Sequence, residues 1–142
     1  MARSKWQRGL IIVSLIFAGE AIFTLPYHVT RFFRPTFLEV FQLSATELGV
    51  AQSAYGFIAI AAYFFGGPLA DRFEPRKLLA GSLWATALGG LYLATFPDVS
   101  GIMLVWGFFG LTNIVLFWAA LSKVTRAWRG GDQQGLAYGL LD

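Results

Sequence analysis

Two apolar parts of the chain are joined by the stretch GGPLADRFEPRKLL, residues 66–79. In this stretch Asp71 follows a Gly-Gly-Pro run and precedes a basic segment. Because glycine and proline end helices, we expect one helix to end before Asp71 and the next to begin after it. The Asp71 carboxylate can then accept hydrogen bonds from unpaired backbone N–H groups and pair with Arg72, Arg76 or Lys77. Such a cluster clamps two helices together at a surface.

The segments on both sides of this loop are long enough to cross a membrane. A helix needs about 20 mostly apolar residues to span the hydrocarbon core. Four stretches qualify, at about 9–29, 48–70, 78–96 and 101–122, and the last two contain no charged residue. We therefore expect an all-α membrane protein with four transmembrane helices. They form one partial bundle within residues 1–142, ending in a tail over 123–142.

The composition agrees with a membrane protein. Of the 142 residues, 56% are hydrophobic, 13% are charged and none is cysteine, whereas an average soluble domain is about 25% charged. An ordinary soluble enzyme, a disordered tail and a disulfide scaffold are thereby excluded. The basic residues lie in short clusters between apolar runs, which is typical of membrane-protein loops and not of nucleic-acid binding. The first apolar run is too long for a signal peptide, so we expect it to be retained.

The distribution of lysine and arginine predicts an orientation. Of the 11 basic residues, only Arg31 and Arg34 fall on one side of the four expected helices. All the others lie in the N-terminal segment, the Asp71 loop or the segment after Ser122. Positively charged loops stay inside the cell. We therefore expect a multi-pass protein of the cytoplasmic (inner) membrane with both termini cytoplasmic.

The 66–79 loop also resembles the signature G-x-L-A-D-R-x-G-R-R/K of the major facilitator superfamily, which joins the second and third helices of those transporters. The positions that match in register are Gly67, Leu69, Ala70, Asp71 and Arg72. Glu74 and Pro75 depart from the pattern, and Arg76 and Lys77 restore the basic charge. The resemblance implies that these glycine, aspartate and basic positions gate transport by contacting the other half of a transporter. The alternative is a charge cluster that only fixes the orientation of the helices.

This resemblance implies that the chain is the first part of a six-helix bundle of a secondary transporter, either a symporter or an antiporter. Such a protein moves a small solute by alternating access and meets its remaining helices as partners within the bilayer. A narrower resemblance, to the organophosphate and organic-anion branch, rests on D-R-x-x-P-R, on Phe117-Trp118 and on Lys123. It implies an organic anion or a sugar derivative as solute, and Lys123 as a cytoplasmic charge partner. Alanines replace the usual prolines after Trp118, and Lys123 replaces an arginine.

Glu20 lies near the middle of the first expected helix. A charge at that depth costs about 2.5–3.5 kcal/mol on insertion scales, so we expect Glu20 to face the bundle interior. Thr24 and Tyr27 follow it on the same helical face, and His28 is adjacent. We expect this stripe to line a polar pathway, where Glu20 exchanges a proton or binds a cationic group of the solute. A structural hydrogen bond to a neighbouring helix is the alternative.

His28 and three further residues are candidates for binding the solute along the same pathway. His28 falls where the organic-anion branch carries a substrate-binding arginine, so the resemblance implies an anion ligand there; an interfacial histidine is the alternative. Gln52 and Tyr55 have helical spacing on the second helix, and Asn113 is a polar residue deep in the fourth. They either line a central cavity with Glu20 or form hydrogen bonds between helices.

The chain lacks the patterns of other chemistries. It has no Ser/His/Asp set, no phosphate-binding glycine loop ending in Lys-Ser/Thr, and no metal cluster, since it holds one histidine and no cysteine. We expect no enzyme activity, no cofactor and no metal, and transport driven by gradients. The chain stops within the second three-helix repeat of such a fold, so we expect an incomplete sequence. The alternative is a complete small four-helix membrane protein that acts as an oligomer or a subunit.

Overall fold

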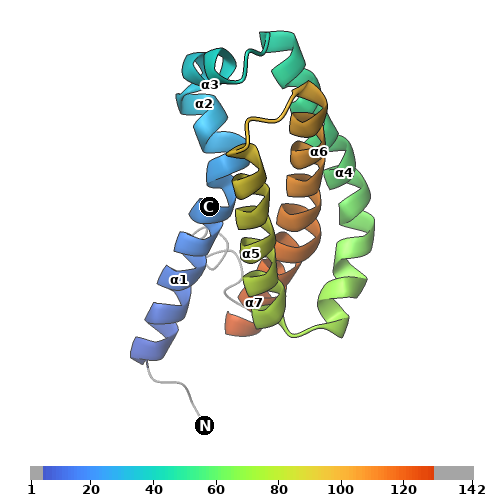
Figure 1. Cartoon of the computed structure of the whole chain (residues 1–142). Helices are drawn as coiled ribbons and strands as arrows, with labels where there is room; N and C mark the ends of the chain where they lie inside the picture. The colour runs from blue at the N-terminus through green and yellow to red at the C-terminus, as the bar shows by residue number, and fades with distance from the viewer. Residues whose placement is uncertain (1–4, 130–142) are drawn as a thin grey trace.

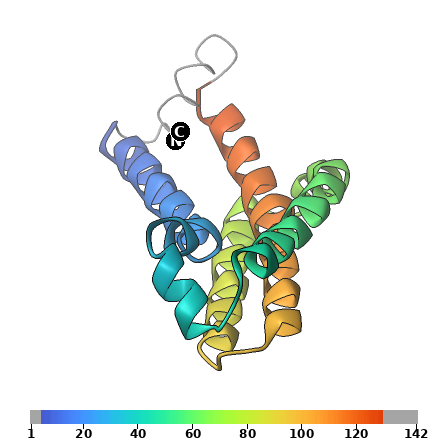
Figure 2. The ribbon, with the colours of Figure 1, turned by 90° about the horizontal axis from the view of Figure 1, so that it is seen from above.

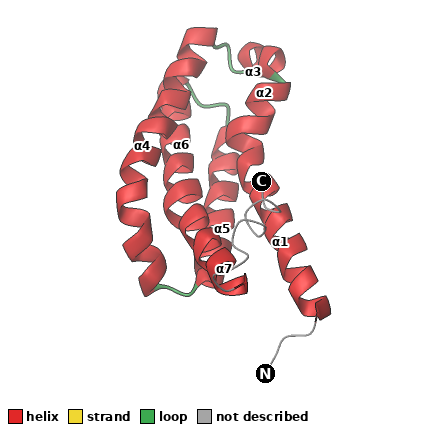
Figure 3. Ribbon diagram, turned by 180° about the vertical axis from the view of Figure 1, so that it is seen from behind, coloured by secondary structure: helices red, strands yellow, loops and turns green. Residues whose placement is uncertain are grey.

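The computed structural model describes residues 5–129, apart from the side chains at positions 5, 7, 8, 66, 67, 70 and 126–129. The described part consists of helices joined by short turns, with no strand in it (Figure 3). In chain order the elements are α1 (Lys5–Phe23), the π-helix η1 (Thr24–Val29), α2 (Thr30–Phe32), α3 (Arg34–Val40), α4 (Ala45–Arg72), α5 (Pro75–Leu93), α6 (Val99–Gly110), the π-helix η2 (Leu111–Trp118) and α7 (Ala119–Arg129).

Successive long helices run in opposite directions (Figure 1). The α1–η1 segment leads to α2 and α3 at one end of the bundle, and α4 returns to the other end. α5 runs back beside α6, and the continuous α6–η2–α7 helix descends again between α4 and α5. Seen from above, α1 diverges from α7 (Figure 2). The bundle is therefore tight around α6 and η2 and open between α1 and α7.

Three segments of the described chain, not four, are long and apolar enough to cross a membrane: Gly9–Phe32, Ala45–Phe65 and Val99–Thr125. The prediction of a fourth such span was wrong, although α5 does form at that place. α5 has only 19 residues, and its first turn carries Arg76 and Lys77. It ends earlier than expected because Phe96 adopts a left-handed φ of 53° before Pro97.

The structure differs from the expected boundaries at three further places. The loop expected between the first two spans contains α2 and α3. α4 does not end at Gly-Gly-Pro but continues through Pro68 to Arg72, as membrane helices tolerate an internal proline. The fourth helix extends through α7 to Arg129, so the start of the expected tail is helical, and residues 130–142 lie outside the described part.

Local sequence signals explain where the helices begin. Ser44 and Glu47 have the S-x-x-E spacing from which a capping box is predicted, and the structure contains it: Ser44 Oγ accepts from the Glu47 amide at 3.2 Å, and Glu47 Oε2 accepts from the Ser44 amide at 2.7 Å. Asp98 caps α6 by accepting from the Gly101 amide at 2.9 Å. Both caps lie at the end of the bundle that carries α2 and α3, and they fix the register of α4 and α6 there.

The core forms where small residues let helices approach. Leu48, Ala51, Trp106 and Phe109 are buried between α4 and α6. A Cβ atom on Gly110 would lie 2.8 Å from the Tyr55 carbonyl oxygen, so only glycine fits that contact without displacement. In lipid, where the hydrophobic effect does not bring helices together, such close packing is a main source of cohesion.

Candidate functional site

Pro26 shapes the first span. Proline has no N–H, and its ring clashes with the carbonyl four residues earlier, which here belongs to Ile22. The helix accordingly widens into η1 around Pro26, a buried residue. The Ile22 carbonyl accepts a hydrogen bond from Asn113 Nδ2 of η2 at 3.4 Å. A backbone group that proline leaves unpaired in the first span is thus satisfied by a side chain of the third, Val99–Thr125.

Asn113 also anchors a buried polar network that the sequence did not predict. Thr86 of α5 and Thr112 of η2 lie 2.9 Å apart through their hydroxyl oxygens, and both donate to Asn113 Oδ1, at 3.3 and 3.2 Å. All three side chains are at most 4% exposed. Two roles were open for Asn113, lining a cavity or bonding between helices. The structure has the second, since Asn113 forms hydrogen bonds between helices. The network joins α1, α5 and η2.

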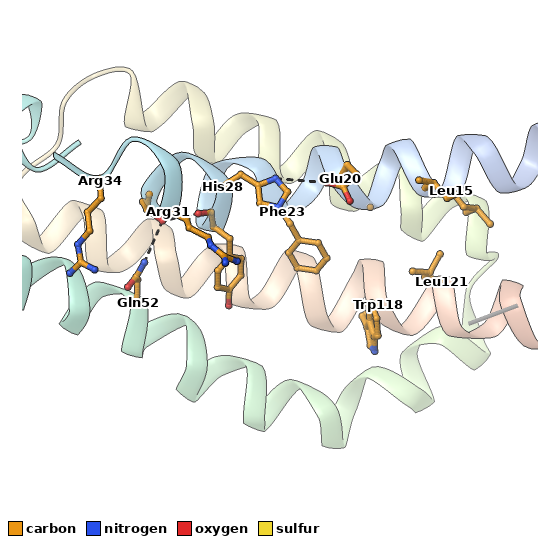
Figure 4. Close-up of a pocket in the computed structure, with 13 residues that line it drawn as sticks. Leu15, Glu20, Phe23, His28, Arg31, Arg34, Gln52, Trp118 and Leu121 are labelled. Atoms are coloured by element: carbon orange, nitrogen blue, oxygen red, sulfur yellow. Dashed lines mark hydrogen bonds and ion pairs between the residues drawn. The ribbon is translucent and has the colours of Figure 1, made fainter. Parts of the chain in front are cut away.

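A cavity of about 570 Å³ opens between the α1–η1–α2 segment and the facing side of α4, η2 and α7 (Figure 4). One end of it is polar, with Arg31, Arg34 and Gln52. The other end is apolar, with Leu15 and Leu121. Among the expected pathway residues, it brings together Glu20, Tyr27, His28 and Gln52. The arrangement suits a small solute with one charged and one apolar part.

Glu20 faces this cavity and not the interior of the four-helix bundle, which corrects the expectation of burial. Its side chain is 71% exposed, and its Oε2 lies 3.9 Å from Nδ1 of His28 (Figure 4). Because the cavity is open on that side, the Glu20 carboxylate does not lie in an apolar environment. Thr24 does not line the cavity. Its hydroxyl donates to the Glu20 backbone carbonyl at 2.7 Å, a bond within the helix.

Arg31 and Arg34 were missed as site residues because sequence reasoning placed them in an exposed loop. The helix instead continues through η1 into α2, so Arg31 lies one turn beyond His28. Both arginines line the cavity. Gln52 of α4 donates to the Thr30 hydroxyl at 3.4 Å, which ties α2 to α4 beside them. The spacing of His28 and Arg31 was the available signal, but the first span was expected to end at about residue 29, before Arg31.

Tyr27 and Tyr55 join the two sides of the cavity region. Their ring centroids lie 5.1 Å apart at 81°, an edge-to-face contact between η1 and α4. Tyr55 is 5% exposed, and its hydroxyl interacts with the side chains of Tyr27 and Asn113. Tyr55 therefore connects the cavity to the buried network.

The 66–79 loop differs from its expected form. Because α4 continues to Arg72, Asp71 sits in the last turn of a helix, where carbonyl groups and not N–H groups are unpaired. Its exposed carboxylate pairs with none of Arg72, Arg76 and Lys77; the ion pair of this loop joins Lys77 Nζ to Glu74 Oε2 at 3.4 Å. Lys123 Nζ of α7 donates to the backbone carbonyl of Asp71 at 3.4 Å. Lys123, expected as a cytoplasmic charge partner, therefore contacts the main chain of the loop through this bond. Gly67 lies within α4.

The described residues offer no site for a metal ion, since no three His, Cys, Asp or Glu side chains gather among them. The chemistry of the cavity is that of charge pairing, hydrogen bonding and ring contacts. With long apolar helices around a partly polar cavity, the chain has the form of a multi-pass membrane protein.

Comparison with known proteins identifies the family. Residues 9–142 match the Major Facilitator Superfamily. The chain belongs to this superfamily, whose members are membrane transporters. No solved structure matches the chain.

Three curated relatives extend this result. Over 142 residues, the chain is 31% identical to inner membrane protein YihN and 26% identical to inner membrane protein YqcE, both of Escherichia coli K12. Each match covers all of this chain and 33% of the relative. A Mycoplasma pneumoniae protein, the uncharacterized MG294 homolog, is 28% identical over 91% of this chain and 30% of its own length. The chain thus spans about a third of the length of these relatives.

Proposed function

We propose that this chain forms part of a gradient-driven secondary transporter that carries a small anionic solute across the inner membrane by alternating access. The observation that carries the proposal is the cavity, which holds Arg31, Arg34 and His28 against a single carboxylate, Glu20. Arginine forks match carboxylate and phosphate groups, and a partly dehydrated site strengthens that attraction. The inner-membrane relatives support the location, and the positive-inside pattern supports cytoplasmic termini.

Glu20 and His28 supply a route for coupling. The Glu20 carboxylate lies 3.9 Å from Nδ1 of His28 at the cavity wall, and His28 lies one helical turn before Arg31. When a solute anion binds at Arg31, it competes with Glu20 for the nearby positive charge. Protonation of Glu20 removes that competition, so proton and anion bind together. In this proposal the 66–79 loop gates the cytoplasmic end, with Asp71, Arg72, Arg76 and Lys77 meeting the other half of the transporter.

The anion site is tested by ligand-induced stabilisation of the protein encoded by the full reading frame, purified in detergent. A ligand that binds only the folded state raises the unfolding temperature. We expect inorganic phosphate or benzoate to stabilise the wild type, and Arg34→Gln to abolish that shift. Arg34→Lys should retain part of it, because charge persists while the bidentate fork is lost.

Glu39→Gln is a control for the loss of an exposed charge on the same helix, since Glu39 shares α3 with Arg34 but does not line the cavity. It should leave the anion-dependent shift unchanged. An equal shift in wild type and in Arg34→Gln would show that the anions act elsewhere, and the proposed site would then be wrong.

A further inference from the structure

We propose that the solute is an anion that bears a flat ring, and that the ring lies in an aromatic groove beside the cationic end of the cavity. This inference rests on the proposed function and adds the second half of the ligand. It assigns a binding role to the aromatic side chains of a neighbouring groove, three of which also line the anion cavity.

The groove is a separate open cavity of about 430 Å³ between η1, α4 and η2. Its floor includes Gly56 and Ala59 of α4, whose small side chains leave room for a flat group. No atom lies within 4 Å of a Cβ built on Gly56. The aromatic side chains that line the groove are Phe23, Tyr27, Tyr55, Tyr63 and Trp118.

The groove and the cationic cavity share a wall. Phe23, Tyr27 and Trp118 line both. In the close-up, Arg31 lies toward one end of the cavity and Trp118 toward the other, with Phe23 between them (Figure 4). One molecule with its anionic group at Arg31 can therefore extend a ring toward the side chains that the cavity and the groove share.

The rings are arranged to receive another ring. Phe23 and Tyr27 have centroids 6.0 Å apart at 56°, and Tyr27 meets Tyr55 edge to face. Inclined rings at these distances present both faces and edges, which are the geometries that aromatic pairs prefer. An alkyl chain of the same length would bury area but would gain nothing from that geometry.

The tyrosine and phenylalanine side chains of α4 lie on different sides of the helix. Tyr55, Ala59 and Tyr63 follow one another at four-residue spacing on the groove side. Phe57 and Phe64 point elsewhere and are 74% and 78% exposed, as expected for side chains in contact with lipid. Tyrosine hydroxyls need hydrogen-bond partners that lipid tails cannot offer. The tyrosine side of α4 therefore faces a solute path, and the phenylalanine side faces lipid.

The test compares matched anions binding to the full reading-frame product by titration calorimetry. The pairs are phenyl phosphate with n-butyl phosphate, and benzoate with pentanoate. We expect the ring member of at least one pair to bind about fivefold more tightly, the size of a typical aromatic contact. Tyr63→Leu should remove that preference, and Tyr63→Phe should keep it. Phe64→Leu, the neighbouring exposed aromatic outside the groove, is the matched control and should also keep it.

The outcomes separate the two proposals. In one outcome, anions bind, Arg34→Gln weakens their binding, and the ring and chain members of each pair bind equally tightly. That result overturns the ring site and leaves the anion site standing. The same holds if a ring preference exists and Tyr63→Leu leaves it intact, since the groove is then covered by another part of the protein. If none of the four anions binds the wild type, the proposed anion site falls, and the ring site falls with it.

Discussion

Asn113 of η2 forms hydrogen bonds to α1 and α5, and the stability that it contributes depends on Pro26. Asn113→Leu removes one hydrogen-bond acceptor from the Thr86 and Thr112 hydroxyls and leaves the Ile22 carbonyl without its side-chain donor. We expect it to lower the free energy of unfolding by about 1–2 kcal/mol, the upper range for interhelical hydrogen bonds in membranes. Thr24→Ala, which removes a bond within one exposed helix turn, should cost less.

A double-mutant cycle measures the link to Pro26. Pro26→Ala supplies an N–H that can pair with the Ile22 carbonyl, so Asn113→Leu should cost less in that background than in the wild type. Unfolding in a denaturing detergent titration gives the four stabilities. Strict additivity of the two changes would contradict the proposed satisfaction of Ile22 by Asn113.

Glu20 is predicted to matter for coupling and little for folding. Because the Glu20–His28 pair is long and exposed, Glu20→Gln should change the unfolding temperature less than Asn113→Leu does. Uptake into vesicles, by contrast, should lose its response to an imposed pH gradient, while solute binding persists. A pH-driven uptake equal to that of the wild type would rule out Glu20 as the proton site. Glu39→Gln controls for the loss of a surface carboxylate.

At the contact between α4 and α6, a single glycine sets the distance between helices. Gly110→Ala places a methyl group 2.8 Å from the Tyr55 carbonyl, so the helices must separate. We expect a loss of about 1–3 kcal/mol, typical of overpacking. Gly81→Ala is the matched control on α5, because a Cβ there meets nothing within 4 Å. Equal unfolding midpoints for the two variants would contradict the packing of α4 on α6.

The helices themselves could be predicted from apolar runs and end signals, and the Ser44–Glu47 cap was predicted to the residue. The same end signals were misleading where a membrane helix continues through a proline. Pro68 was taken as a helix end, but in α4 the helix passes through it to Arg72. Arg31 was assigned to a loop, but the helix continues through the π-helix η1, which contains Pro26, into α2.

The site was predicted in part. Glu20 and His28 line one cavity, and their spacing along one helix is readable from the sequence, whereas Gln52 reaches the same cavity from α4. The network of Thr86 and Thr112 with Asn113 was not predicted, since which faces of two distant helices meet depends on packing. Thr86 and Asn113 are 27 residues apart, and no local pattern connects them.

At the scale of the whole molecule, substitutions in and around the 66–79 loop can distinguish an effect on folding from an effect on transport. Lys123 binds the backbone carbonyl of Asp71, so Asp71→Asn keeps that bond while it removes the carboxylate. In the full reading-frame product, Asp71→Asn should reduce uptake more than it reduces membrane insertion or stability. Lys123→Met should reduce both, because it loses the contact between α4 and α7. Normal uptake by Asp71→Asn would contradict a gating role for the loop.

The most direct measurement is the reaction of a single cysteine in the cavity with charged thiol reagents. The chain has no cysteine, so Gln52→Cys can be examined in membrane vesicles once any other cysteines of the full product are replaced. A positively charged, water-filled cavity predicts faster labelling by an anionic methanethiosulfonate than by a cationic one, with the difference lost in Arg34→Gln. Phe57→Cys, on the lipid side of the same helix, should label slowly with both. Equal rates for the two reagents at Gln52→Cys, or no labelling, would contradict an anion path through this cavity.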